Sequence, residues 1–424
     1  MYEEMLENGI KLLCYPIPHA YSTSIGLYIK SGSKYETPKQ QGISHFLEHM
    51  HFRGSGTNEQ KRLYVLTQKM GTDLIAKTYK ELTQFQLKIR PEYLIQACII
   101  IKNVIENYSW NEEHLEAEKR IILEEIAEKS DYLSIHSCLD EFLWPGQPIS
   151  KNILGTEESV SGITLNDILQ YKRARFMPGN LCIIVTGAVE NENIYEITNI
   201  FRQIKLNNSN QTNKKLIFDK MKQQKADIHF KYCNWTCLDI CLSFEMGNYK
   251  NDMEKLLLLN SILGGGDGSR LQEVLKEEKG YSYNVFSEIY EHQNSLKFCI
   301  YFSVQKENLY KTFKLIVQTV QYIKSNMTEL ELIMNKPYFI NNIWFDLENP
   351  QALNEQIGWD MFLYERDMYN IDNKIKKFKK ITKEDLQDIA KRVFRPENML
   401  VVILGNTKGI NKRNLNQIIK NGLS

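Results

Sequence analysis

The sequence predicts an α+β fold made of two homologous domains, and three observations carry this prediction. First, 424 residues are too many for one typical domain. Second, ITLNDILQYKRARFMPGNLCIIVTGAV at 163–189 is similar to ITKEDLQDIAKRVFRPENMLVVILGNT at 381–407. Third, residues recur between these segments at one constant offset: Asp167, Phe176, Pro178, Asn180 and Gly187 match Asp385, Phe394, Pro396, Asn398 and Gly405. The chain therefore contains a duplicated α+β unit.

The elements of the two copies follow in the same order. In each repeat a threonine precedes an amphipathic run, which predicts a capped helix, and a Pro-x-Asn break leads into a buried strand. Upstream, RLYVLTQKMGTDLIAKTYKELTQFQLKI and RLQEVLKEEKGYSYNVFSEIYEHQNSLKFCIYF each predict a helix, a glycine stop and two strands joined by a turn. A long helical stretch follows each of them, at 91–108 and 306–326. The polar stretch LNNSNQTNKKLIFDKMKQQK predicts a linker at 206–226, between domains at 1–205 and 227–424.

The composition is that of an ordinary globular protein, with 42% hydrophobic and 25% charged residues. Basic and acidic residues number 53 and 52, so no overall field attracts nucleic acid or an anionic membrane. No apolar run is long enough to span a membrane, and the acidic start MYEEMLENGIK lacks the features of a secretion signal. We therefore expect a cytoplasmic protein whose eight scattered cysteines are reduced structural thiols.

The stretch GISHFLEHMHFRGS at 42–55 predicts a metal site. On a helix, His45 and His49 lie about 40° apart around the axis, so both imidazoles can reach one ion. Glu48 lies on the flank of this pair, where a carboxylate can accept a proton from an attacking water. Zinc catalysis uses this arrangement, with three protein ligands, an open fourth position and a carboxylate base. His51 points to the other side of the helix and is not expected to be a ligand. The alternative interpretation is a solvated helix whose histidines face water.

A third ligand is expected on a second helix, which HLEAEKRIILEEIAEKSDYL predicts at 114–133. Its candidate carboxylates are Glu116, Glu118, Glu124, Glu125 and Glu128. Most of them are expected on a solvated face. Glu118 and Glu125 are seven apart, on one helix face that also contains apolar side chains, which favours a carboxylate that faces inward. Spacing alone does not select the residue.

Taken in order, these segments resemble the pitrilysin/insulinase family of zinc peptidases, inverzincins whose signature is His-x-x-Glu-His. The family includes the mitochondrial processing peptidase and small two-domain bacterial relatives. NGIKLLCYPIP and TSIGLYIKSGSKYE resemble its opening strands, GISHFLEHMHFRGS its metal helix, and AKTYKELTQF the following strand pair. EKRIILEEI resembles the segment with the third ligand, and GGGDGSRLQEVLKEEKGYSYNV the loop and helix of the second domain. The resemblance implies two α/β sandwich domains that form half of a clamshell.

The resemblance also implies a set of site residues. The metal ligands would be His45, His49 and Glu125, with Glu48 as the base and Glu118 as an inward carboxylate behind the ligands. One Zn²⁺ per chain is expected, because the second half has the apolar stretch MEKLLLLNSILGGG where the metal motif would recur. GGGDGS is not followed by Gly-Lys-Ser/Thr, so it predicts a flexible loop and not a nucleotide site.

Two departures from the family pattern concern the substrate. The substrate is expected to add as a strand to a sheet edge formed by Leu74, Ile75, Ala76, Lys77 and Thr78. Relatives carry Asn-Ala before the strand threonine, whereas Ile75 cannot hydrogen-bond a peptide carbonyl through its side chain. Active relatives also supply an Arg and a Tyr, seven apart, from the second domain. Here these positions are Lys276 and Tyr283, and lysine lacks the planar guanidinium fork. Tyr283 is the candidate donor to the oxyanion.

These features predict a bacterial zinc endopeptidase that cleaves peptides or unfolded segments. The small relatives point to leader-peptide removal from ribosomally made peptide natural products, and general peptide turnover is the alternative. A non-catalytic subunit is a further alternative, against which the complete set of metal ligands and base argues. Because two domains are half of what single-chain relatives carry, we expect a dimer. Lys276 in place of the family arginine favours a heterodimer with a sister family member over a homodimer, and no nucleic-acid or membrane partner is expected.

Overall fold

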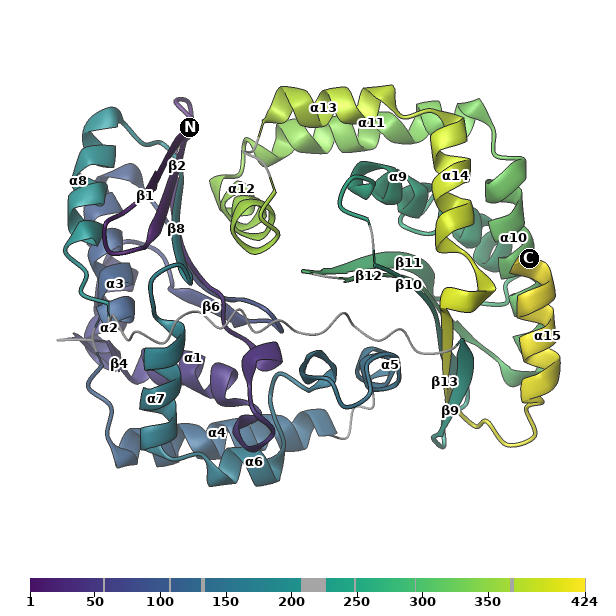
Figure 1. Ribbon diagram of the computed structural model, residues 1–424, viewed down its shortest axis with the longest axis horizontal. Helices are drawn as coiled ribbons and strands as arrows, with labels where there is room; N and C mark the ends of the chain where they lie inside the picture. The colour runs from purple at the N-terminus through teal and green to yellow at the C-terminus, as the bar shows by residue number, and fades with distance from the viewer. Residues whose placement is uncertain are drawn as a thin grey trace. The chain divides into compact units, whose positions relative to one another are not determined.

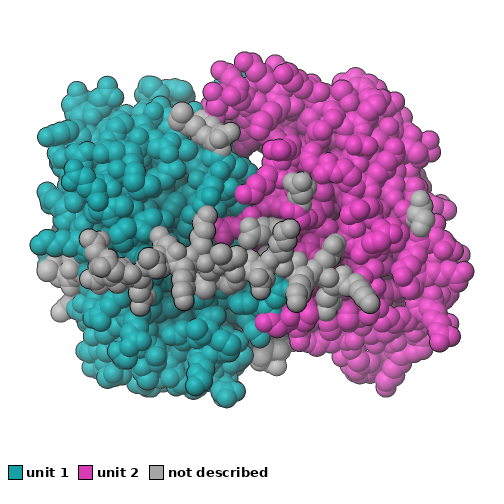
Figure 2. All heavy atoms as spheres, viewed as in Figure 1, with its two compact units in different colours: residues 1–132, 147–217, 344–369 teal, residues 133–146, 218–343, 370–424 magenta. Residues whose placement is uncertain are grey.

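The computed structural model describes residues 1–55, 58–106, 108–130, 134–206, 226–247, 249–293, 295–366 and 370–423. Of the linker predicted at 206–226, residues 207–225 lie outside these ranges. The chain forms two compact units (Figure 1; Figure 2). Unit 1 consists of residues 1–132, 147–217 and 344–369, and unit 2 of residues 133–146, 218–343 and 370–424. No helix within the described ranges has the length and apolar character that a membrane span requires.

The units are not continuous in sequence, because each contains a segment from the other half of the chain. Residues 344–369, from the second half, belong to unit 1. Residues 133–146, from the first half, belong to unit 2. The predicted domains at 1–205 and 227–424 are defined by the sequence repeat, whereas the compact units are defined by contacts in space. The predicted boundaries therefore stay a prediction.

Unit 1 is built around a mixed six-stranded sheet. Its strands, in spatial order, are β1 (Tyr2–Met5), β2 (Lys11–Pro16), β8 (Leu181–Gly187), β3 (Thr23–Ile29), β7 (Thr83–Ile89) and β6 (Ile75–Thr78). β2 and β8 are parallel, and the other neighbours are antiparallel. The central strand β3 is buried along its whole length, since both faces of the sheet are covered.

The helices of unit 1 pack on the two faces of this sheet, some of them directly and others against those helices. They are α1 (Ile43–Arg53), α2 (Gln60–Lys69), α3 (Leu94–Glu106), α4 (Glu112–Ser130), α6 (Glu157–Gly162), α7 (Leu165–Arg175), α8 (Asn191–Arg202), α12 (Pro350–Ile357) and the adjoining η7 (Gly358–Leu363). Between α1 and α2, β4 (Gly54–Ser55) pairs with β5 (Asn58–Glu59). On one face, Ile25, Leu27 and Ile29 of β3 enter a core shared with α1 and α3. The other face packs against α12 (Figure 1).

Asn354 fixes α12 on the sheet. The side chain is fully buried. Its Nδ2 donates to the carbonyl oxygens of Ile184 at 2.8 Å and Ser24 at 3.2 Å, and its Oδ1 accepts from the Tyr28 hydroxyl at 2.7 Å. Gly26 permits this close approach, because a Cβ at that position would lie 2.3 Å from Oδ1 of Asn354. The buried amide of Asn354 is therefore satisfied at both its oxygen and its nitrogen.

Unit 2 contains a five-stranded sheet. Its strands, in spatial order, are β11 (Val285–His292), β12 (Ser295–Val304), β10 (Leu238–Met246), β13 (Met399–Gly405) and β9 (Asp227–Tyr232). β9 and β13 are parallel, and the other neighbours are antiparallel. The helices are α5 (Ile135–Leu143), α9 (Met253–Leu263), η5 (Gln272–Glu278), α10 (Leu309–Ser325), α11 (Glu329–Asp346, whose last residues belong to unit 1), α13 (Ile371–Lys380), α14 (Lys383–Val393) and α15 (Lys412–Leu423).

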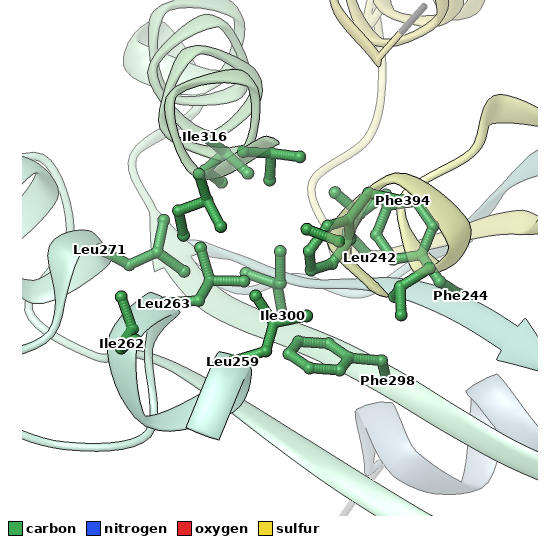
Figure 3. Close-up of a cluster of buried hydrophobic side chains, with 14 of the residues drawn as sticks. Leu242, Phe244, Leu259, Ile262, Leu263, Leu271, Phe298, Ile300, Ile316 and Phe394 are labelled. Carbon is green, nitrogen blue, oxygen red and sulfur yellow. The ribbon is translucent and has the colours of Figure 1, made fainter. Parts of the chain in front are cut away.

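The core of unit 2 packs the sheet against α9, α10 and the end of α14, as Figure 3 shows. The ring of Phe394 meets those of Phe244 and Phe298 edge-on, each at 5.1 Å between centroids. α5 lies against β10 and β13, and its Asp140 forms a buried ion pair with Lys297 of β12. In each unit, a helix from the other half of the chain therefore packs against the sheet.

The sequence repeat folds alike in both units. Thr164 caps α7 together with Asp167, and Thr382 caps α14 together with Asp385, each pair in a reciprocal capping box. A strand buried along its whole length follows each helix, β8 in one unit and β13 in the other. The predicted order of helix, break and buried strand is confirmed, as is the α+β fold class.

Candidate metal centre

Helix α1 places His45 and His49 side by side, as their spacing predicts. The centroids of the two imidazole rings are 4.5 Å apart, and the ring planes cross at 65°. The opposite side of the helix anchors it in the core of unit 1, where Phe46, Met50 and His51 are fully buried. His51 lies among aromatic rings there, away from the pair. Because the apolar residues of α1 are buried in the core, the imidazoles of His45 and His49 lie on the side of the helix that faces away from it.

Glu125 of α4 completes a group of three potential ligands. Its Oε2 lies 3.8 Å from Nε2 of His45 and 4.0 Å from Nε2 of His49, and the three ligand atoms all lie within 4.8 Å of one another. Ligand atoms about 2.1 Å from a tetrahedral ion are roughly 3.4 Å apart, so a small contraction closes this group on one ion. The described part of the chain holds no second group of this kind. Nitrogen and oxygen donors of these types suit Zn²⁺, while the neighbouring Glu124 is exposed.

Glu118, also on α4, orients His49. Its Oε2 lies 2.9 Å from Nδ1 of His49, while Arg53 donates to its Oε1. Because a carboxylate accepts hydrogen bonds, Nδ1 of His49 carries the proton and Nε2 keeps the lone pair that a metal requires. Burial acts to raise the pKa of Glu118, but its hydrogen bonds with His49 and Arg53 outweigh burial and hold that pKa below its usual value. Glu118 therefore stays charged behind the histidine.

Glu48 lies beside the three potential ligands in a nearly buried position. The residue is only 9% exposed, and its Oε2 accepts a hydrogen bond from the Thr78 hydroxyl at 2.5 Å. Burial raises the pKa of Glu48 above its usual value, although the Thr78 hydroxyl and His49 act in the opposite direction. A carboxylate with a raised pKa is a stronger base. The hydrogen bond from Thr78 holds this carboxylate in place beside the potential ligands.

The strand β6 brings the predicted substrate-binding residues to the edge of the unit 1 sheet. Among the strands that the structure describes, β6 pairs with β7 alone. Thr78 reaches Glu48 of α1, so Ala76 and Thr78 face α1 while Ile75 and Lys77 point to the opposite face. Leu74 precedes the strand and is buried. The backbone of this edge is therefore in a position to pair with another strand.

A pocket of about 300 Å³ opens beside the centre. Its polar wall consists of Glu48, His49, Arg53, Gln60 and Glu118, and its apolar wall of Phe52, Tyr64 and Ile121. The candidate base thus borders a space with both polar and apolar walls, as small-molecule and peptide sites usually have.

Lys276 and Tyr283 belong to unit 2, on η5 and just before β11. The Tyr283 side chain is 91% exposed, and Nζ of Lys276 lies 5.9 Å from the centre of its ring. Both side chains are accessible on the surface of that unit. Their roles stay predictions.

Sequence reasoning missed two contacts of the centre. Arg53, which binds Glu118, stands four residues after His49 on the same side of α1, so helical spacing was the signal that could have found it. The bond between Thr78 and Glu48 joins a strand to a helix 30 residues away, and no periodic pattern marks such a contact.

Two imidazoles and a carboxylate around one point, with a buried carboxylate beside them, are the side chains of a metal-dependent hydrolase. Residues 16–157 match the insulinase family (peptidase family M16), and residues 162–336 match the peptidase M16 inactive domain. An uncharacterized zinc protease from Rickettsia felis is 30% identical over 368 residues, which cover 83% of this chain and 85% of that protein. The chain belongs to the insulinase family of peptidases.

Two further comparisons support the same family and fold. Mitochondrial-processing peptidase subunit beta from Caenorhabditis elegans is 23% identical over 402 residues, which cover 91% of this chain and 86% of that protein. The crystal structure of a protease from Helicobacter pylori matches with a TM-score of 0.86 and 20% identity, over 95% of this chain and 99% of that chain. The family resemblance that the sequence predicts is confirmed.

Proposed function

We propose that this chain is a zinc-dependent endopeptidase that cleaves peptides or unfolded segments. The observation that carries the proposal is the meeting of His45, His49 and Glu125 beside the nearly buried carboxylate of Glu48. These three residues would hold the ion, which when bound supplies a Lewis acid that polarises the scissile carbonyl and acidifies water. The proton transfer would be carried out by a side chain of unit 1.

Glu48 moves the proton in the proposed reaction. Its carboxylate takes a proton from the attacking water and delivers it to the leaving amine. The Thr78 hydroxyl donates to Oε2 of Glu48. Glu118, which Arg53 holds in place, accepts from Nδ1 of His49. The residues that would react and those that orient them therefore all come from α1, α4 and β6.

The substrate would add as a strand to the open edge of β6. Main-chain hydrogen bonds with residues 74–78 would supply affinity with a loose sequence preference. Because Thr78 contacts Glu48, a strand on this edge runs past the base. Ile75 would contribute its backbone and an apolar side chain, without the side-chain hydrogen bond that an asparagine offers there.

Metal content tests the proposed ligands. We expect about one zinc per wild-type chain, and we expect His45→Ala, His49→Ala and Glu125→Gln each to lose it, because a three-ligand site does not tolerate a missing ligand. The exposed neighbour Glu124 provides the matched control, since Glu124→Gln should keep its zinc. Metal analysis of the purified proteins measures this. Zinc retained in Glu125→Gln but lost from Glu124→Gln would show that the ligand is the neighbouring residue.

As a narrower role, we propose that the chain removes leader peptides from ribosomally made peptide natural products in the cytoplasm. Its eight cysteines are all free, which suits a reducing compartment. General peptide turnover is the alternative. Mass spectrometry of the peptides that accumulate in cells without the protein distinguishes the two roles. A single leader-bearing precursor indicates the first, and a broad set of peptides the second.

We further propose that the active form is a dimer in which a sister family member supplies an arginine and a tyrosine to this zinc site. The relative from Caenorhabditis elegans is itself named as a subunit, which supports an assembly of family members. Lys276 also stands where the family carries arginine, so the pair in this chain lacks the bidentate fork. A homodimer, in which Lys276 and Tyr283 suffice, is the alternative.

Activity of the chain alone tests this assembly. We expect the purified chain to gain at least about tenfold in peptide hydrolysis when a sister protein is co-expressed, because the missing donors stabilise the oxyanion. Tyr283→Phe in this chain should then have little effect, as should the control Tyr281→Phe. Full activity of the chain alone, abolished by Tyr283→Phe and not by Tyr281→Phe, would exclude the borrowed pair.

A further inference from the structure

We propose that Glu36 is the positioning residue of the metal helix. Its carboxylate anchors the first turn of α1 and thereby holds His45 where it meets His49 and Glu125. This inference rests on the proposed zinc site and extends it to a residue outside the pocket. Glu36 lies in the segment between β3 and α1, and it is only 7% exposed.

Both oxygens of the Glu36 carboxylate bind the start of α1. Oε2 accepts a hydrogen bond from the backbone N–H of Gly42 at 2.8 Å, and Oε1 accepts one from the N–H of Ser44 at 2.9 Å. Such amides have no partner within their own helix. The negative charge also lies at the positive end of the helix dipole. Since Ser44 precedes His45 directly, the anchor acts one residue from the first imidazole.

The first turn of α1 depends on this anchor because its own N-cap residue has no side chain. The N-cap is Gly42, with φ at +89°, and no side chain of the cap itself bonds to the helix. A Cβ at this position would lie 2.5 Å from the carbonyl oxygen of Leu154, so the close packing requires glycine. The capping group must therefore come from elsewhere in the chain, and Glu36 supplies it.

The side chain of Ser44 is hydrogen-bonded as well as its backbone N–H. Its hydroxyl lies 2.7 Å from the hydroxyl of Tyr171 on α7, which in turn lies 3.4 Å from the hydroxyl of Ser31. The far end of α1 is tied to α4 by the ion pair of Arg53 described above. The metal helix is thus fixed at both ends, with the two imidazoles between them.

Loss of the anchor at one end should affect the metal more than the substrate. Release of the first turn moves His45 relative to Glu125, and a misplaced ligand lowers metal affinity and rate together. The substrate edge β6 is not bonded to Glu36, so KM should stay unchanged. A purely structural cap would lower the melting temperature without this selectivity.

The test is the Glu36→Gln variant in the full chain. The amide keeps the shape of the side chain, but its NH₂ group faces a backbone N–H, so one of the two hydrogen bonds is lost. Three quantities are measured: the zinc Kd by competition with a chelator, kcat and KM for a peptide, and the melting temperature of the zinc-free protein. We expect zinc affinity to fall by at least about tenfold and kcat to fall with it, while KM is unchanged.

Glu190→Gln is the control, because Glu190 is the exposed N-cap residue of α8, which carries no ligand. Both variants should lower the melting temperature, but only Glu36→Gln should change the zinc Kd. Glu36→Asp keeps the charge with a shorter reach and should recover part of the affinity. If Glu36→Gln does not fold, Tyr171→Phe loosens the same turn by removing the hydroxyl that Ser44 contacts, and it should weaken zinc binding less strongly.

Wild-type zinc affinity in Glu36→Gln, or an equal loss in Glu190→Gln, would overturn the positioning role. So would wild-type affinity in Tyr171→Phe when Glu36→Gln does not fold. A wild-type chain that binds no zinc or cleaves no peptide would instead overturn the proposed function, so the two failures are distinguishable.

Discussion

The Glu48→Gln variant should bind zinc as tightly as the wild type and hydrolyse peptides at least about 100-fold more slowly. Glutamine can still accept the hydrogen bond of the Thr78 hydroxyl at the oxygen of its amide. It cannot take a proton from water, so the step that Glu48 is proposed to perform has no base. Metal analysis and steady-state kinetics on the same preparation check both halves of this expectation.

A second glutamate-to-glutamine change serves as the control for this experiment. Glu124→Gln alters an exposed side chain of α4 and should leave both zinc content and kcat at wild-type values. Near-normal hydrolysis by Glu48→Gln would remove Glu48 as the base. Loss of zinc from Glu48→Gln would point to a structural part for this carboxylate in the centre.

The second large effect is expected at Asn354 of α12. We expect Asn354→Ala to destabilise unit 1 by about 3 kcal/mol, because it leaves the buried Tyr28 hydroxyl without its partner and opens a cavity between α12 and the sheet. For a unit of this size, that loss lowers the melting temperature by roughly 6–12 °C. Differential scanning calorimetry of the full chain measures the transition.

Asn341→Ala is the matched control for this stability experiment. Asn341 is an exposed asparagine of α11, and its substitution should change stability by no more than about 0.5 kcal/mol. A melting temperature of Asn354→Ala equal to that of the control would mean that α12 does not hold the sheet of unit 1. The contact would then contribute little to the folding of the unit that carries the metal centre.

The sequence alone predicts the features that depend on residues a few positions apart, such as helical periodicity and helix caps. His45 and His49 stand four apart on a helix whose apolar residues form the buried side, so their pairing follows from helical periodicity. Thr164 and Thr382 each begin a capped helix before a buried strand, and the repeat itself is visible as two similar segments. These elements need no knowledge of distant contacts, because hydrophobic period and capping residues act within a few positions.

The order of segments along the chain carried further information, through the family resemblance. Spacing left five glutamates open as the third ligand, and the resemblance selected Glu125. The structure brings that carboxylate to the two imidazoles and leaves Glu124 exposed. A single helix presents several acidic side chains, and only its packing against α1 decides which of them faces the pair.

The tertiary structure alone decided the contacts that support the centre. Glu36 caps a helix that begins seven residues later, Thr78 binds Glu48 across 30 residues, and Asn354 reaches Tyr28 across 326 residues. Nor does the sequence show that residues 344–369 pack in unit 1 and residues 133–146 in unit 2. A hydrogen bond between distant segments constrains two side chains without imposing a period on either segment. Such bonds form only once the sheet and its helices have brought the partners together.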